Sequence, residues 1–179
     1  MRDFHFPGRS AVYAENGMCA TSHPLAAKTA LEILQRGGNA MDAAIAGAVL
    51  LGLCEPQMTG LGGDCFVLFS PAGSDDIRAM NGSGKSPQAL QAQLLRDQGH
   101  GVIPQRGVEA ITIPGAVDAF CELSDDWGKL GLDALLAPSM HYAEAGIPVA
   151  PRVAYDWAGS VDVLQGSAKK DYLLSGKAP

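Results

Sequence analysis

Apolar residues at helical spacing mark the first part of the chain. Between residues 27 and 34 they recur at i, i+3, i+4 and i+7, which predicts a helix with one narrow apolar face. This helix should begin near Ser22 or His23, because Pro24 suits the first turn of a helix. Gly37-Gly38 should end it, since glycine adopts the left-handed conformation at a helix stop. We expect His23 to be a capping or packed residue rather than a catalytic base.

The next segment is apolar on nearly every side. Asn39 suits the cap of a second helix, and Asp42 follows at the positive end of that helix. No polar residue occurs from Ala43 to Leu53. The pattern therefore predicts a buried helix, which ends at Pro56 and has Asp42 and Glu55 as charges near its two ends.

Short runs of β-branched and aromatic residues predict strands at three places. Turn residues separate the runs Cys65–Phe69 and Ile77–Met80, and Val108–Ile113 is expected to form a third strand. Earlier in the chain, the tight-turn signal Glu15-Asn16-Gly17 predicts a hairpin over residues 11–21.

Helical patterns return in the second half of the chain. Strands combined with helices predict a layered α+β arrangement, which we expect to be one incomplete domain over residues 1–179. Residues 1–10 look like an extended arm, and residues 160–179 have no clear periodicity. The expected helices are Gln88–Arg96, a helix from Pro114 to near Gly128, Leu132–Ala145 and Ala150–Trp157.

Composition narrows the functional classes. The chain has 179 residues, of which 47% are hydrophobic, so it can build a sizeable core. A net charge of −6 argues against nucleic acid or an anionic membrane as a partner. No apolar run is long enough to span a membrane, and the N-terminus has no apolar signal region, so we expect a cytoplasmic protein. The four cysteines and four histidines lack metal-ligand spacing, so no metal site is expected.

The loop Asn81-Gly-Ser-Gly-Lys-Ser-Pro87 is the strongest candidate for a binding site. Its two glycines allow a ligand to approach the backbone and expose N–H groups to an anion. Gly84-Lys85-Ser86 matches the end of a phosphate-binding loop, but the first glycine of that motif falls on Ala79. A turn that holds no ligand stays open as the structural alternative.

Two ordered blocks of sequence resemble the γ-glutamyltranspeptidase family. The first block resembles the opening of such enzymes, and the second resembles a later stretch in the same order, so together they cover most of residues 10–155. The first comprises Cys19–Ala48, Glu55-Pro56 and Gly60-Leu-Gly-Gly63, and the second comprises Ile113–Val117, Leu132–Met140 and Ala143–Val149.

The resemblance implies an N-terminal nucleophile hydrolase, an αββα sandwich of which this chain supplies the N-terminal part of the large subunit. In the family, self-cleavage frees a threonine at the start of the small subunit, which attacks an amide carbonyl with its own amino group as the base. The implied partners are that downstream subunit and a small-molecule amide, and a dimer of such heterodimers is compatible with it. No organic cofactor is implied. No catalytic residue is expected here, because every threonine lies in the region that matches the large subunit.

The candidate loop departs from the family's usual sequence. The equivalent segment typically reads Arg-Glu-Thr-Ala-Pro, and its arginine grips the α-carboxylate of the substrate. Aligned on Pro87, that arginine falls on Ser83, which cannot make a charge-assisted clamp, so γ-glutamyl specificity is in doubt. A divergent branch of the family has Asn-Gly-Ser-Gly followed by Arg or Lys at this loop, and this chain resembles that branch. We expect Lys85 or Arg78 to supply a positive charge in place of the arginine. The expected substrate-binding residues are Asn81, Gly82, Ser83, Gly84 and Lys85. A non-catalytic, self-contained binding module or remnant of this fold is the alternative.

Overall fold

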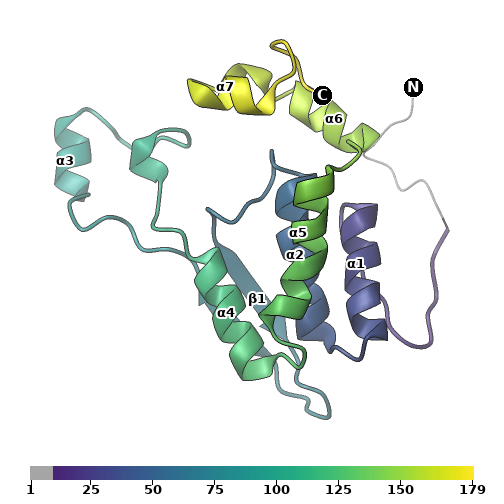
Figure 1. Cartoon of the computed structure of the whole chain (residues 1–179). Coiled ribbons are helices and arrows are strands. Elements are labelled where there is room, and N and C mark those ends of the chain that lie inside the picture. The colour runs from purple at the N-terminus through teal and green to yellow at the C-terminus, as the bar shows by residue number, and fades with distance from the viewer. Residues whose placement is uncertain (1–9) are drawn as a thin grey trace. The chain divides into compact units, whose positions relative to one another are not determined.

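A computed structural model describes residues 10–179 (Figure 1). The described residues form two compact units: the first comprises residues 10–60 and 127–179, and the second comprises residues 61–126. The expected arm over residues 1–10 lies outside the described part except for its last residue. One incomplete domain over the whole chain stays a prediction.

Three packed helices form the core of the first unit. Helix α2 (Ala40–Cys54) lies against both α1 (Pro24–Gln35) and α5 (Leu132–Ala145) (Figure 1). The buried side chains come from all three helices and include Ile33, Leu50 and Leu135. Burial of each such side chain stabilises the fold by about 1.5–3 kcal/mol. The predicted buried helix at 43–53 is thus confirmed and lies at the centre of the unit.

The ends of α1 and α2 form as the sequence predicts. The Nδ1 atom of His23 accepts the N–H of Leu25, and Pro24 occupies the first turn of α1. After α1, Gly37 has a φ of 91°, a left-handed conformation that favours glycine. At the start of α2, Asn39 and Asp42 bind each other's backbone N–H in a capping box.

The remainder of the first unit is less regular. Helix α6 (Pro151–Ala158) confirms the helix expected at 150–157. The aperiodic end contains a short 3-10 turn, η2 (Val161–Val163), and helix α7 (Ser167–Tyr172). The hairpin predicted over residues 11–21 is wrong, because this segment contains no strand. A two-stranded hairpin without further packing is marginal in water, and nearly all of these residues are exposed.

A two-stranded sheet and one long helix organise the second unit. Strand β1 (Cys65–Phe69) pairs antiparallel with β2 (Arg78–Gly82), in a register that sets Cys65 opposite Gly82. Helix α4 (Ala116–Trp127) lies beside the sheet (Figure 1). The sheet has two unlike faces, because successive side chains point to opposite sides. Cys65, Val67 and Phe69 are half-buried, whereas Phe66 and Leu68 are 69% and 76% exposed.

The segment between the sheet and α4 differs from the sequence prediction. Helix α3 (Ala92–Asp97) is shorter than the expected 88–96, and a single 3-10 turn, η1 (Val108–Ala110), replaces the expected third strand. Val108 and Ile111 have β-branched side chains, but in the described structure no neighbouring strand pairs with them. The α+β class is confirmed for the part of the chain that is described. None of its helices has the length and apolar character needed to cross a membrane.

Candidate functional site

The candidate loop begins at the end of β2. Asn81 and Gly82 are the last residues of the strand, and Ser83 to Lys85 follow it. The Oδ1 atom of Asn81 accepts the N–H of Ser83 at 3.0 Å, which closes a local turn. The position of this loop directly after a strand agrees with the sequence prediction.

Two residues directly before β1, Gly63 and Asp64, connect the loop to other parts of the unit. The Oδ1 atom of Asp64 accepts the N–H of Gly84 at 2.8 Å and lies 3.5 Å from the Thr112 hydroxyl, which can donate to it. The carbonyl of Gly63 accepts the N–H groups of Gly115 and Ala116 at 3.1 and 3.0 Å. Residues 63 and 64 therefore connect the loop to the segment that enters α4.

The glycines of the loop are required by close backbone approach. A Cβ atom at Gly84 would lie 1.5 Å from the carbonyl oxygen of Ile113. One at Gly82 would lie 2.5 Å from the Cβ of Ala119, and one at Gly115 would lie 2.4 Å from the carbonyl oxygen of Gly82. The loop thus passes the start of α4 at a distance that admits no side chain at these positions.

These contacts change the expected chemistry of the loop. The sequence suggests glycine-rich backbone whose N–H groups are open to an anion. In the structure, the N–H of Ser83 is bound to Asn81 and that of Gly84 to Asp64. Two of the donors that an anion would use are therefore already occupied within the chain.

The surroundings of Ser83 are acidic. A hollow of about 120 Å³ lies beside it, and among the described residues that line this hollow Asp118 and Glu122 are charged, whereas Lys, Arg and His are absent. Lys85 is exposed and does not line the hollow. Arg78 lies at the far end of β2, roughly 16 Å from Ser83 for five extended residues. The complete lining is Met80, Asn81, Gly82, Ser83, Gly115, Asp118, Ala119 and Glu122.

The phosphate-loop interpretation of Gly84-Lys85-Ser86 does not fit the structure. A phosphate loop needs a helix that starts at its Lys-Ser pair, so that the first helical N–H groups face the phosphate. Here the next helix, α3, starts at Ala92, and Ala79 lies within β2 opposite Leu68. The geometry therefore lacks the element that would bind a nucleotide phosphate.

Other polar residues singled out in the sequence have structural partners in the first unit. Glu55 is buried and accepts the Ser22 hydroxyl at 2.7 Å. Asp42 is fully buried and also binds the backbone N–H groups of Lys129 and Leu130, a role beyond the helix-end charge that the sequence indicates. Within residues 10–179, no three His, Cys, Asp or Glu side chains gather as metal ligands would.

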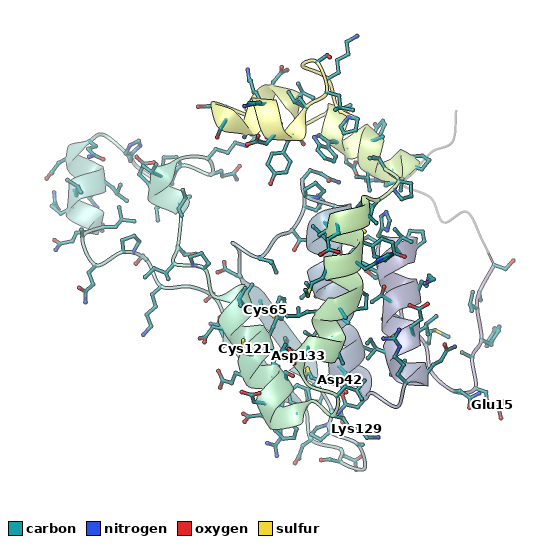
Figure 2. The ribbon with its side chains drawn as sticks, in the orientation of Figure 1. Glu15, Asp42, Cys65, Cys121, Lys129 and Asp133 are labelled. Carbon is teal, nitrogen blue, oxygen red and sulfur yellow. The ribbon has the colours of Figure 1, made fainter. Side chains whose placement is uncertain are left out.

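Sequence reasoning missed the residues that hold the loop. Asp64 and Thr112 are 20 and 28 positions away from Gly84 in the chain, and no local pattern joins them to it. The available signal is an aspartate that follows a glycine pair and directly precedes a strand. Figure 2 labels Cys65, the first residue of that strand, and Cys121 on α4, and both are half-buried free cysteines.

The chain is similar to several proenzymes. It is 34% identical over 172 residues to a glutathione hydrolase-like proenzyme, YwrD, of Bacillus subtilis, covering 94% of this chain and 32% of the relative. It is 35% identical over 178 residues to the oxamate amidohydrolase proenzyme of Klebsiella pneumoniae, covering 95% and 33%. The chain thus spans about a third of the length of these relatives.

A solved structure and a family model agree with these similarities. The crystal structure of cephalosporin acylase from Bacillus halodurans superposes with a TM-score of 0.86 at 40% identity, covering 99% of this chain and 34% of that one. The family model described as Gamma-glutamyltranspeptidase matches residues 26–179. This match takes in both units and the candidate loop. The chain belongs to the gamma-glutamyltranspeptidase family and corresponds to the N-terminal portion of its members.

Proposed function

We propose that this chain is the N-terminal segment of the large subunit of a self-processing amide hydrolase or acyltransferase. A downstream small subunit supplies the nucleophilic threonine, whose own amino group acts as the base. The threonine attacks the amide carbonyl and expels the amine, and water or a second amine then releases the acyl group. The observation that carries this proposal is the family match over residues 26–179, together with coverage of about a third of the proenzyme relatives.

The exposed face of the sheet supports the proposal that this chain is one part of a larger fold. Phe66 and Leu68 present large apolar side chains on the face of β1 that α4 does not cover. Large apolar side chains that are exposed on one face of a sheet suit contact with another element. We infer that later parts of the protein cover this face and complete an αββα sandwich.

The loop at the end of β2 is our candidate for the acyl-binding site. It comprises Asn81, Gly82, Ser83, Gly84 and Lys85. The acidic lining beside Ser83 favours an acyl group that carries an amine or no charge over one that carries a carboxylate. Lys85, as the cation of the loop itself, is the candidate partner for a substrate carboxylate that lies outside the hollow.

Expression of the complete reading frame tests the proposal. We expect two polypeptides, the smaller of which begins with threonine by N-terminal sequencing. Replacing that threonine by alanine should leave the precursor uncleaved and inactive. A suitable substrate panel is the p-nitroanilides of γ-glutamate, glutarate and 4-aminobutanoate, because the second lacks the α-amino group and the third lacks the α-carboxylate. A full-length protein that is never cleaved, and that releases no nitroaniline from any of the three anilides, would contradict the proposal.

The isolated segment separates this proposal from the alternative of a self-contained binding module. Without the nucleophile it should have no amidase activity, and its uncovered sheet face should bind a hydrophobic dye strongly or cause aggregation. A cooperative, monodisperse protein of 179 residues with weak dye binding would favour the module. We also propose a cytoplasmic location, which cell fractionation with an antibody against the mature protein would test.

A further inference from the structure

Asp64 holds the candidate loop by a contact that spans 20 residues of sequence. Its Oδ1 atom accepts the N–H of Gly84, at the centre of the loop, at 2.8 Å. The same oxygen lies 3.5 Å from the hydroxyl of Thr112, just before the segment that enters α4. One carboxylate oxygen therefore connects the start of β1, the loop after β2 and the chain before α4.

The loop is also confined from its other side. The carbonyl of Lys85 accepts the N–H of Ile113 at 3.0 Å, and the backbone of Gly84 passes directly beside the carbonyl of Ile113. The N–H of Gly84 thus points to Asp64 while the following carbonyl is bound to the opposite segment. These two contacts hold the backbone from Gly84 to Lys85 in place. They thereby set the direction in which the side chains of Ser83 and Lys85 leave the backbone.

We propose that Asp64 is the positioning residue of the acyl-binding loop in the complete enzyme. In this role it contacts neither the scissile bond nor the nucleophile. It acts through Gly84, because an accepted N–H fixes the orientation of the Gly84 peptide and so the placement of Ser83 and Lys85 toward the acyl group. The inference rests on the proposed function of the loop.

The hydrogen bond, rather than the charge, is the active feature of Asp64. Asparagine retains an Oδ1 acceptor in the same position, so Asp64→Asn should preserve the loop. Alanine removes the acceptor and leaves the Gly84 N–H to water, and a loop ordered by water loses its fixed geometry. Glutamate retains the charge but moves the acceptor by one methylene, so Asp64→Glu should resemble Asp64→Ala.

Steady-state kinetics of the complete, processed enzyme test the inference with its best substrate from the p-nitroanilide panel. A loop that binds the acyl group equally in the ground state and the transition state affects KM more than kcat. We expect Asp64→Ala and Asp64→Glu to raise KM about tenfold, with kcat within about threefold, and Asp64→Asn to restore KM to within about threefold of the wild type. Asp75→Ala is the matched control, because Asp75 is an exposed aspartate in the β1–β2 turn.

Each outcome of this experiment decides something. An unchanged KM in Asp64→Ala or Asp64→Glu, with processing and melting temperature intact, would overturn the inference. Equal losses in Asp64→Ala and Asp64→Asn would also overturn it, since they would assign the effect to charge. If Asp64→Ala does not accumulate as processed enzyme, Asp64→Glu and Asp64→Asn suffice for the comparison. A wild-type protein without processing or turnover would overturn the proposed function first, and this inference with it.

Discussion

Both carboxylate oxygens of Asp42 accept the backbone N–H of Lys129, at 3.0 and 3.1 Å (Figure 2). Asp42 lies in the first turn of α2 and is fully buried, and it also accepts the N–H groups of Asn39 and Leu130. Asn39 completes the connection by donating its side-chain amide to the carbonyl of Trp127 at 2.7 Å. One capping box therefore joins the start of α2 to the turn that precedes α5.

Loss of Asp42 should therefore destabilise the first unit. Asp42→Ala would leave the partly buried N–H groups of Asn39, Lys129 and Leu130 without this acceptor, and we expect the free energy of unfolding of the complete protein to fall by about 3 kcal/mol. Asp133→Ala is the control, because Asp133 is exposed in the first turn of α5 and should contribute below about 1 kcal/mol. Denaturant unfolding of both variants provides the measurement, and equal small losses would contradict the structural role of Asp42.

Steric confinement of the loop leads to a second prediction. Gly84→Ala would place a Cβ 1.5 Å from the Ile113 carbonyl oxygen, so the loop or the segment before α4 must move. We expect a destabilisation of about 1–3 kcal/mol, together with a large loss of activity in the processed enzyme. At Gly101, in the same unit, a Cβ would meet no atom within 4 Å.

Gly101→Ala is accordingly the control for this glycine effect. Its free energy of unfolding should stay within about 0.5 kcal/mol of the wild type, and its activity should be unchanged. Thermal melts and initial rates of the two variants, measured side by side, distinguish close packing from a general effect of added side chains. A stable, active Gly84→Ala enzyme would show that the loop does not pass Ile113 as closely as described.

Local signals explain why the helices could be predicted from the sequence. The spacing of apolar residues and the residues at the helix ends, such as His23 and Asn39, act within one or two turns. The third strand failed for the opposite reason. Val108–Ile113 has strand composition, but a strand requires a pairing partner, which only the tertiary structure determines. The glycines at 82 and 84 identify the loop at 81–85 in the sequence. Its contact with Asp64 is not visible there, because that contact depends on how distant segments pack.

The buried thiol of Cys54 provides a prediction on pH. Burial, followed by the neighbouring charge of Glu55, raises the pKa of Cys54 to about 11. An unfolded cysteine has a pKa of about 8.5, so the unfolded state loses its proton first as the pH rises. The contribution of this thiol to stability is therefore complete below about pH 8.5 and is lost as the pH rises toward 11.

A variant without the thiol isolates this contribution. The free energy of unfolding should fall less between pH 8 and pH 10.5 in Cys54→Ala than in the wild type, even though removal of the buried sulfur lowers it at both pH values. In the folded wild-type protein, an alkylating reagent at pH 8.5 should leave Cys54 unmodified, as peptide mass analysis would show. Rapid alkylation of Cys54 before unfolding would contradict its burial.

The acyl specificity of the enzyme provides the last prediction. The resemblance to the family leads us to expect Ser83 in the place of the arginine of typical members, and Asp118 and Glu122 line the hollow beside Ser83. Loss of a charge-assisted contact to a buried partner costs about 2–5 kcal/mol, which is roughly 30-fold to several thousand-fold in affinity. We expect kcat/KM to be highest for the 4-aminobutanoyl anilide, lower for the γ-glutamyl anilide and lowest for the glutaryl anilide.

Substitutions in the loop test the cause of that order. Ser83→Arg should raise kcat/KM for the γ-glutamyl anilide and for glutathione by about tenfold if loop geometry is kept, and adding Glu122→Gln should raise it further by removing a competing carboxylate. Lys85→Ala should lower whatever γ-glutamyl turnover the wild type has, because Lys85 is the nearest cation of the loop itself. Efficient wild-type turnover of glutathione that survives Lys85→Ala would show that another residue binds the α-carboxylate, and that Ser83 does not occupy the position of the arginine.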